Sequence, residues 1–194
     1  MPKSLCVFCG SSPGRHPLYA EAAAEFGAKL VAAGYQLVYG GGRVGLMGIV
    51  ADSVLQAGGE VVGVIPHFLN SKEIGHSGVT RLEAVDTMHE RKARMEKLSD
   101  AFVALPGGFG TYEEILEIIT WGQLGLHRKP IGLFNLKGYY EPLLSQVERG
   151  IEEGFIKPSY RQLLVAADSA DALLAALERY QPPKVKQWLV AGET

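Results

Sequence analysis

The residues best suited to chemistry lie in one glycine-rich segment, LPGGFGTYEE, at positions 105–114. An apolar run at 101–105 predicts a buried strand before it, and the pattern after it predicts a helix. Its glycines let the backbone bend and let an anion approach closely, and the free amides of a helix start bind anions. Thr111 can cap that helix or donate its hydroxyl to the anion. Glu113 and Glu114 would repel an anion unless one faces a neighbouring reacting group, so the segment predicts a phosphorylated substrate cut at a neighbouring carbon.

Two further glycine turns follow predicted strands. Residues 10–14 follow the strand expected at 5–9, and residues 40–48 follow the strand expected at 36–39. In an open parallel sheet the ligand lies outside the carboxyl ends of the strands, near a switch point in strand order. We therefore expect these two turns and the turn at 107–110 to meet at one edge of the sheet.

The second turn also matches the dinucleotide pattern Gly-x-Gly-x-x-Gly over residues 40–45. The acidic residue that such a site needs at the end of the next strand is missing, because Glu60 lies at the beginning of that strand. A nicotinamide dinucleotide is therefore disfavoured. A phosphate or nucleotide loop is the favoured interpretation, and glycines that serve only tight packing and turning remain the alternative.

Charged residues lie on the helices expected before and after the strand at 101–105. Arg91 and Lys92 belong to a charged helix at 87–98, where a solvated face is the usual explanation. At the mouth of a phosphate site, however, the rigid fork of an arginine fits phosphate or ribose oxygens. Glu114 and Glu117 lie three residues apart and share one helical face. Beside a nucleotide, Glu114 can bind the ribose or orient a water.

The order of elements predicts an α/β protein. Continuous apolar strands that alternate with helices indicate a doubly wound parallel sheet with helices on both faces. We expect strands at 5–9, 36–39, 60–65, 81–85, 101–105, 130–134 and 163–166. We expect helices at 18–33, from 48 to about 57, at 87–98, from the motif at 105–114 to about 124, at 139–153 and at 169–180. The chain of 194 residues predicts a single domain at 1–180, with a loop at 66–80 and a polar tail at 181–194.

Composition excludes several classes of protein. A hydrophobic content of 47% is typical of a globular protein, and the net charge of −2 argues against broad nucleic-acid binding. No apolar run approaches the roughly 20 residues of a membrane span, and the N-terminus lacks the pattern of a signal peptide. We expect a cytoplasmic protein with neither nucleic acid nor membrane as a partner.

The cysteines and histidines predict no metal site. Cys6 and Cys9 form a Cys-x-x-Cys, but positions three apart in a strand point to opposite faces. No second pair or histidine cluster completes a zinc site, so both are expected to be buried, reduced thiols. The five histidines lack ligand spacing.

Apolar residues on the helix after the central motif cover more than one of its faces. A stripe of this width predicts packing against both the sheet and a partner chain, hence a homodimer. The residues concerned are Ile115, Leu116, Ile118, Ile119 and Leu124.

The motifs together resemble those of the Lonely Guy (LOG) family, the cytokinin riboside 5′-monophosphate phosphoribohydrolases. PGGFGTYEE at 106–114 resembles the family signature Pro-Gly-Gly-x-Gly-Thr-x-x-Glu, and MHERK at 88–92 is similar to its second motif. The glycine loop at 40–48 and the opening FCGSS at 8–12 are also similar. The resemblance extends from residue 5 to about residue 176, without a departure at the motif positions.

This resemblance implies a Rossmann-like fold, usually dimeric, that hydrolyses the N-glycosidic bond of a nucleoside 5′-monophosphate to a free base and ribose 5-phosphate. It assigns catalysis to Arg91 and Glu114. It implies no cofactor, and no lysine here lies in a context that suggests pyridoxal phosphate chemistry. The substrate contacts that it implies are Gly10, Ser11, Gly41, Gly42, Gly45, Met88, Lys92, Gly107, Gly108, Gly110 and Thr111.

The implied reaction suits these residues. Cleavage of an N-ribosyl bond builds positive charge on the sugar, which the Glu114 carboxylate can stabilise while it orients the attacking water. Arg91 can position the ribose or polarise the leaving base. Two alternatives stay open: a general AMP nucleosidase without preference for N6-modified bases, and a molybdenum-cofactor carrier of the same fold that binds without catalysis.

Overall fold

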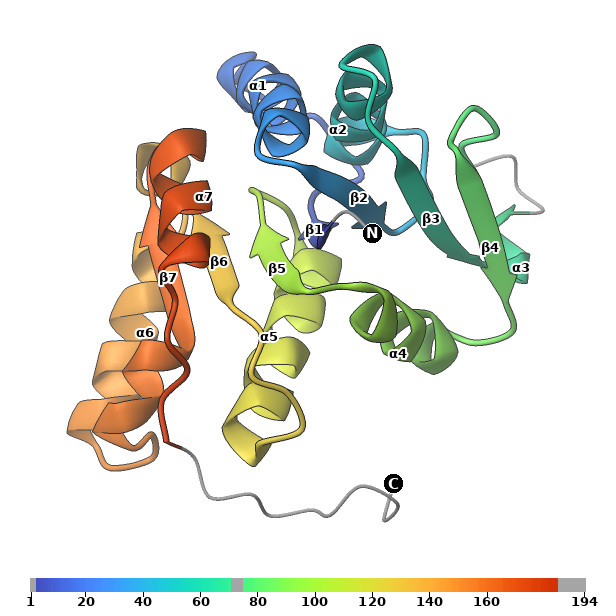
Figure 1. The fold of residues 1–194 in the computed structure, drawn as a ribbon. Helices are drawn as coiled ribbons and strands as arrows, with labels where there is room; N and C mark the ends of the chain where they lie inside the picture. The colour runs from blue at the N-terminus through green and yellow to red at the C-terminus, as the bar shows by residue number, and fades with distance from the viewer. Residues whose placement is uncertain (1–2, 71–74, 185–194) are drawn as a thin grey trace.

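A computed structural model describes residues 3–70 and 75–184 of the chain, and these residues form an α/β sandwich (Figure 1). In this part of the chain a seven-stranded sheet has the order β4-β3-β2-β1-β5-β6-β7, and every neighbouring pair of strands is parallel. The predicted doubly wound parallel sheet is therefore confirmed. The strands are β1 Lys3–Phe8, β2 Tyr35–Tyr39, β3 Val61–Pro66, β4 Arg81–Val85, β5 Ala101–Ala104, β6 Ile131–Phe134 and β7 Leu164–Ala167.

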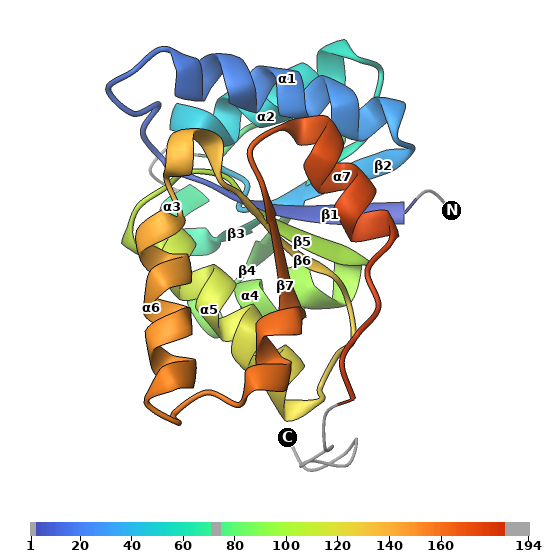
Figure 2. The same ribbon diagram turned by 90° about the vertical axis from the view of Figure 1, so that its left-hand side faces the viewer.

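Helices cover both faces of the sheet, as Figure 2 shows. One face carries α1 Leu18–Ala32, α2 Gly45–Gln56 and α7 Ala170–Glu178. The other carries α4 Met88–Leu98, α5 Phe109–Leu124 and α6 Glu141–Glu152. Three short helical segments complete the described part of the chain: α3 His67–Asn70, η1 Leu136–Gly138 and η2 Pro158–Leu163.

The alternating side chains of the strands divide the core into two apolar layers. Cys9 belongs to the layer under α1 and α2, whereas Cys6 belongs to the layer under α4 and α5. Both thiols are free and buried, as the sequence predicted. Burial raises the pKa of each thiol, so both remain protonated.

The strand order reverses between β1 and β5, and this reversal creates the crevice for a ligand. Phe8 pairs with Ala104 in the register of these two strands, so the turns that follow them leave the sheet side by side. The amide of Gly10 donates to the carbonyl of Pro106 at 3.1 Å, and the amide of Leu46 donates to the carbonyl of Gly10 at 3.0 Å. The three glycine turns therefore meet at one edge of the sheet, as the sequence predicted.

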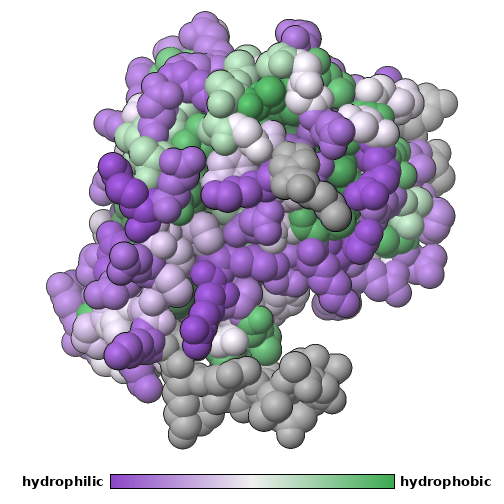
Figure 3. Space-filling model, viewed as in Figure 1, coloured by the Kyte–Doolittle hydropathy of each residue, from purple (hydrophilic) through white to green (hydrophobic). Residues whose placement is uncertain are grey.

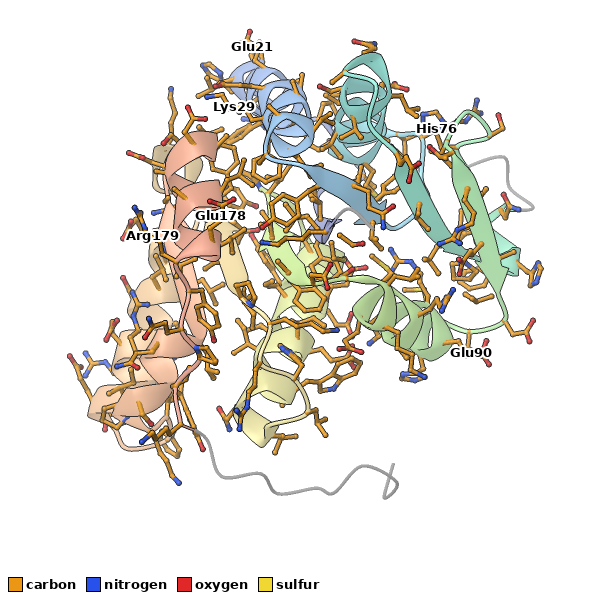
Figure 4. All side chains as sticks on the ribbon, viewed as in Figure 1. Glu21, Lys29, His76, Glu90, Glu178 and Arg179 are labelled. Atoms are coloured by element: carbon orange, nitrogen blue, oxygen red, sulfur yellow. The ribbon has the colours of Figure 1, made fainter. Side chains whose placement is uncertain are left out.

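Helix α4 begins with a reciprocal cap, which fixes the helix that carries Arg91. The Glu90 amide donates to Oγ1 of Thr87 at 3.1 Å, while Oε2 of Glu90 accepts from the Thr87 amide at 3.3 Å. Figure 4 labels Glu90 at this outer end of α4. Such a cap satisfies amides that have no partner within the helix.

The structure differs from the sequence prediction at three helix starts. The expected loop at 66–80 contains α3, a single turn too short to show a helical period, and its residues 71–74 lie outside the described part of the chain. Helix α2 begins at Gly45, within the glycine turn, rather than after it. Helix α5 begins at Phe109 with Gly108 in the capping position, so Thr111 lies in the first turn and does not cap the helix.

No helix within residues 3–70 and 75–184 is long and apolar enough to cross a membrane. Figure 3, drawn from the side of Figure 1, shows a mainly hydrophilic surface over α4. The last residues of the expected polar tail, 185–194, lie outside the described part of the chain.

Candidate active site

A cavity of about 280 Å³ lies where β1, β2, β3 and β5 end, between the three glycine turns and the starts of α4 and α5. Its lining comprises Cys9, Gly10, Ser11, Gly40, Gly42, Met47, Ile65, Leu69, Met88, Arg91, Gly108, Phe109, Gly110, Thr111 and Glu114. A second cavity of about 280 Å³ adjoins it and shares Gly10, Ser11 and Gly108, and Gly107 lines this second cavity. Most of the predicted site residues are thus brought together.

Arg91 and Glu114 form a buried ion pair in the wall of the first cavity. Nη1 of Arg91 lies 2.5 Å from Oε1 of Glu114, and the two side chains are only 8% and 10% exposed. Nε of Arg91 also donates to the carbonyl of Val64 in β3 at 3.1 Å. The guanidinium is therefore held on two sides, in one orientation, beside a carboxylate that faces the cavity.

The environment of Glu114 tunes its acidity in two opposed ways. Burial raises the pKa of the Glu114 carboxyl above its ordinary value of 4.5, while the charge and hydrogen bond of Arg91 lower it and only partly offset the burial. In its ionised form, a carboxylate whose pKa is raised is a better proton acceptor than an exposed glutamate. It suits a general base or a group that orients a water.

The start of α5 presents donors without partners to the cavity. Within the described residues, the amides of Gly108, Phe109 and Gly110 donate no hydrogen bond. Thr111 follows them in the cavity wall, and a β-carbon on Gly107 would lie 2.1 Å from its Oγ1. The glycine therefore lets the threonine hydroxyl lie against the turn. Free first-turn amides beside a hydroxyl form a site for phosphate.

Lys92 occupies a different place from the one that the resemblance implied. Its Nζ forms a hydrogen bond with Glu113 and lies 3.1 Å from Glu117, and its side chain is not among those that line the cavity. Burial opposes the charge of Lys92, but the bonds to the two carboxylates outweigh burial and raise its pKa. Lys92 ties α4 to α5, beside the pair that Arg91 and Glu114 form.

Gly41 and Gly45 do not line the cavity, but each allows neighbouring segments to pack closely beside it. Gly41 has a φ of 76°, which favours glycine, and lies against Ile65 and Leu82. A β-carbon on Gly45 would lie 2.2 Å from the carbonyl carbon of Ser11. Gly45 is therefore what lets the first and second glycine turns touch.

Sequence reasoning missed several lining residues. Gly40 was available as the first glycine of the second turn, but its closeness to Arg91 has no local signature. The other missed residues are Cys9, Met47, Ile65, Leu69 and Phe109. Among the described residues, no group of three or more His, Cys, Asp or Glu could hold a metal ion.

Comparison with known proteins adds independent evidence. A family model described as "Possible lysine decarboxylase" matches residues 47–177. A probable cytokinin riboside 5′-monophosphate phosphoribohydrolase of Oryza sativa subsp. japonica is 52% identical over 184 residues, which are 95% of this chain and 75% of the relative. A cytokinin riboside 5′-monophosphate phosphoribohydrolase of Arabidopsis thaliana is 53% identical over 180 residues, which are 93% of this chain and 84% of the relative.

Solved structures share the fold. A structural-genomics target determined by X-ray crystallography superposes with a TM-score of 0.71 at 25% identity, covering 91% of this chain and 99% of its own. The molybdenum cofactor carrier protein of Chlamydomonas reinhardtii gives a TM-score of 0.68 at 19% identity, covering 93% of this chain and 98% of its own, and this likeness concerns the fold alone. The identity to the plant relatives over most of their length is decisive, and the chain belongs to the Lonely Guy family of cytokinin riboside 5′-monophosphate phosphoribohydrolases.

Proposed function

We propose that this protein hydrolyses the N-glycosidic bond of adenosine 5′-monophosphates, including N6-modified ones, and releases the free base and ribose 5-phosphate. The observation that carries the proposal is that one cavity contains both the buried pair of Arg91 and Glu114 and the unpartnered amides at the start of α5. The names of relatives at 52% and 53% identity support the same reaction.

The proposed site separates positioning from chemistry. The 5′-phosphate binds to the amides of Gly108 and Gly110 and to the hydroxyl of Thr111, away from the bond that breaks. Binding energy from a part of the substrate that does not react holds the ribose in place and stabilises the transition state. A nucleoside without its phosphate is therefore a poor substrate.

Glu114 assists the cleavage of the N-glycosidic bond. As the bond from C1′ to the base nitrogen breaks, its electrons go to the base, which takes up a proton, and positive charge develops on the ribose. The carboxylate of Glu114 stabilises this charge and accepts a proton from the water whose oxygen bonds to C1′. Arg91 favours the ionised form of Glu114 and orients it through their 2.5 Å contact.

The cavity also has an apolar side suited to an N6 substituent. Met47, Ile65, Leu69 and Met88, from α2, β3, α3 and α4, line it. Thioether and branched side chains accommodate an isoprenoid chain, because its burial removes apolar surface from water. We expect N6-isopentenyl-AMP to be preferred over AMP.

The test is the release of ribose 5-phosphate from AMP and from N6-isopentenyl-AMP. Wild type and the Glu113→Gln control should release it from both, since Glu113 is half exposed and lies outside the cavity wall. Glu114→Gln should lose about 10²-fold to 10⁴-fold in kcat, the range expected for a general base. A Glu114→Gln protein that keeps near-normal turnover would refute the carboxylate mechanism. A folded wild type that binds nucleotide without turnover would refute the hydrolase.

We further infer that residues 1–180 form a single domain. We place the protein in the cytoplasm, because unbridged cysteines such as Cys6 and Cys9 are usual there. We also infer that it is a homodimer. Support for the dimer comes from exposed apolar side chains on α5: Phe109 is 91% and Leu116 is 42% exposed. Light scattering should give twice the chain mass for wild type and for a Phe155→Glu control, and the chain mass for Leu116→Glu. A monomeric wild type would contradict the inference.

A further inference from the structure

The turn between β5 and α5 is held through three consecutive carbonyl groups. The Leu105 carbonyl accepts a hydrogen bond from the Tyr140 hydroxyl at 2.7 Å, and the Pro106 carbonyl accepts from the Gly10 amide at 3.1 Å. The Gly107 carbonyl accepts from the hydroxyl of Tyr139. Two of these three donors thus come from adjacent tyrosines that follow β6.

The bond from Tyr139 controls the direction of an amide in the proposed phosphate site. The carbonyl of Gly107 and the amide of Gly108 belong to one planar peptide unit, in which C=O and N–H point in opposite directions. A donor fixed on the Gly107 oxygen therefore fixes the direction of the Gly108 N–H. Gly108 lines both cavities, and its amide has no acceptor among the described residues.

A second tyrosine completes a chain of hydroxyl groups. The hydroxyl oxygens of Tyr112 and Tyr139 are 2.8 Å apart. Because Tyr139 donates its proton to Gly107, it accepts the proton of Tyr112. Burial raises the pKa of Tyr139 to about 12, so its hydroxyl stays protonated and remains a donor at physiological pH. Successive hydrogen bonds of this kind strengthen one another.

The segment between β6 and α6 holds Tyr139 in position. Lys137 and Gly138 both have positive φ, 51° and 73°, and this reverses the chain after Asn135. Oδ1 of Asn135 then accepts from the Tyr140 amide at 2.7 Å. The Tyr139 ring packs edge-on against Tyr140, with 5.1 Å between ring centroids. A non-glycine residue such as Lys137 adopts this conformation only where surrounding contacts hold it.

We propose that Tyr139 is a positioning residue for the phosphate site: its hydroxyl, backed by that of Tyr112, orients the Gly107–Gly108 peptide so that the Gly108 amide faces the phosphate of the substrate. The proposal rests on the proposed function for the identity of the anion. Tyr139 acts on substrate affinity rather than on bond cleavage, because the peptide that it holds lies at the phosphate end of the substrate.

The test compares Tyr139→Phe with wild type in two measurements. Calorimetric titration with ribose 5-phosphate should give a Kd about tenfold higher for the variant, as expected when one well-aligned hydrogen bond is lost. The KM for AMP should rise by the same factor, while kcat at saturation changes by less than about twofold, because uniform binding is lost. The kcat/KM for adenosine, which has no phosphate, should not change.

Two sets of variants make the outcome specific. Tyr112→Phe should raise the Kd by a smaller factor, and the double variant should bind no more weakly than Tyr139→Phe, since Tyr112 acts only through Tyr139. Tyr160→Phe, in η2 and outside both cavity linings, should bind as wild type does. A Tyr139→Phe protein with the wild-type Kd would overturn the proposal. Ribose 5-phosphate binding does not require turnover, so it tests the positioning role even if the hydrolase reaction fails.

Discussion

A β-carbon on Gly40 would lie 2.1 Å from Nη2 of Arg91. The first glycine of the second turn is therefore what allows the guanidinium to lie across the end of β2, between Val64 and Glu114. Its backbone φ does not demand glycine, since Gly40 is not among the residues with positive φ. Glycine is required at position 40 because of the neighbouring Arg91 side chain, so replacing Gly40 should affect the site rather than the fold.

Gly40→Ala should accordingly fold but lose activity. The atom that a methyl group meets is the end of a flexible side chain, so Arg91 shifts and the backbone stays in place. A displacement of about 1 Å at such a pair can cost about 10²-fold in kcat/KM. Kinetics with AMP and thermal unfolding are the two measurements. Gly122→Ala is the matched control, because the nearest atom to its new methyl group is 3.4 Å away. Equal kcat/KM in both variants would contradict the steric role of Gly40.

The ionisation of Glu114 should set an acid limit on kcat. Burial raises the pKa of this carboxyl above 4.5 and Arg91 opposes the rise, so kcat should fall, as pH decreases, with a midpoint above 4.5. In Arg91→Met the midpoint of the residual activity should move to higher pH, because the opposing charge is gone.

The substrate phosphate, with a second pKa near 6, titrates alike with every variant, so comparison between variants isolates Glu114. Arg94→Met is the control for this pH profile: Arg94 lies on the same helix but pairs with Glu83. A midpoint for Arg91→Met that stays in place or moves down would exclude Glu114 as the titrating group.

Replacing Lys92 should reduce stability more than substrate affinity. Lys92→Met removes the ion pairs to Glu113 and Glu117 and leaves Glu117, whose side chain is 25% exposed, without its cation. We expect the free energy of unfolding to fall by about 1 kcal/mol, the low end of the cost of leaving a buried polar group unpaired, because Glu117 is only partly buried. The KM for AMP should stay close to the wild-type value, because Lys92 does not line the cavity. Denaturant titration and kinetics test both points, and a large rise in KM at unchanged stability would restore the phosphate contact that the family resemblance implied.

His127 should make stability depend on pH. Its Nε2 lies 2.9 Å from the Ile118 carbonyl and its Nδ1 accepts from the Lys129 amide, so the neutral ring is satisfied on both sides. Burial lowers the pKa of His127 below 6.5, so the unfolded chain binds a proton more readily than the folded one. The stabilisation from His127 is therefore complete above pH 6.5 and is lost as pH falls through the folded-state pKa.

The measurement is the unfolding free energy of wild type minus that of His127→Gln across this range of pH. The difference should shrink as pH falls. A difference for His127→Gln that grows at low pH would show that the buried ring is charged in the folded protein.

The sequence by itself determined the sheet, the meeting of the three glycine turns and the choice of Arg91 and Glu114 as the candidate pair. Strands and helices can be predicted from local patterns of apolar residues. Parallel strands bring their carboxyl ends to one edge of the sheet, so the turns after β1, β2 and β5 lie at the same edge. Arg91 and Glu114 could be named because each belongs to a segment that resembles a motif of the family, MHERK at 88–92 and PGGFGTYEE at 106–114. Their position at one cavity followed from the fold class.

Only the tertiary structure decided which neighbours these residues have. Nothing local to Lys92 indicates that it pairs with Glu113 and Glu117 rather than with phosphate, because that choice depends on how α4 packs against α5. Tyr139 reaches Gly107 across 32 residues of sequence, through a turn held by Lys137 in a conformation that lysine rarely adopts. Such contacts arise from the packing of distant segments and have no period or spacing in the sequence, which is why residue patterns predict the site but not the groups that hold it in place.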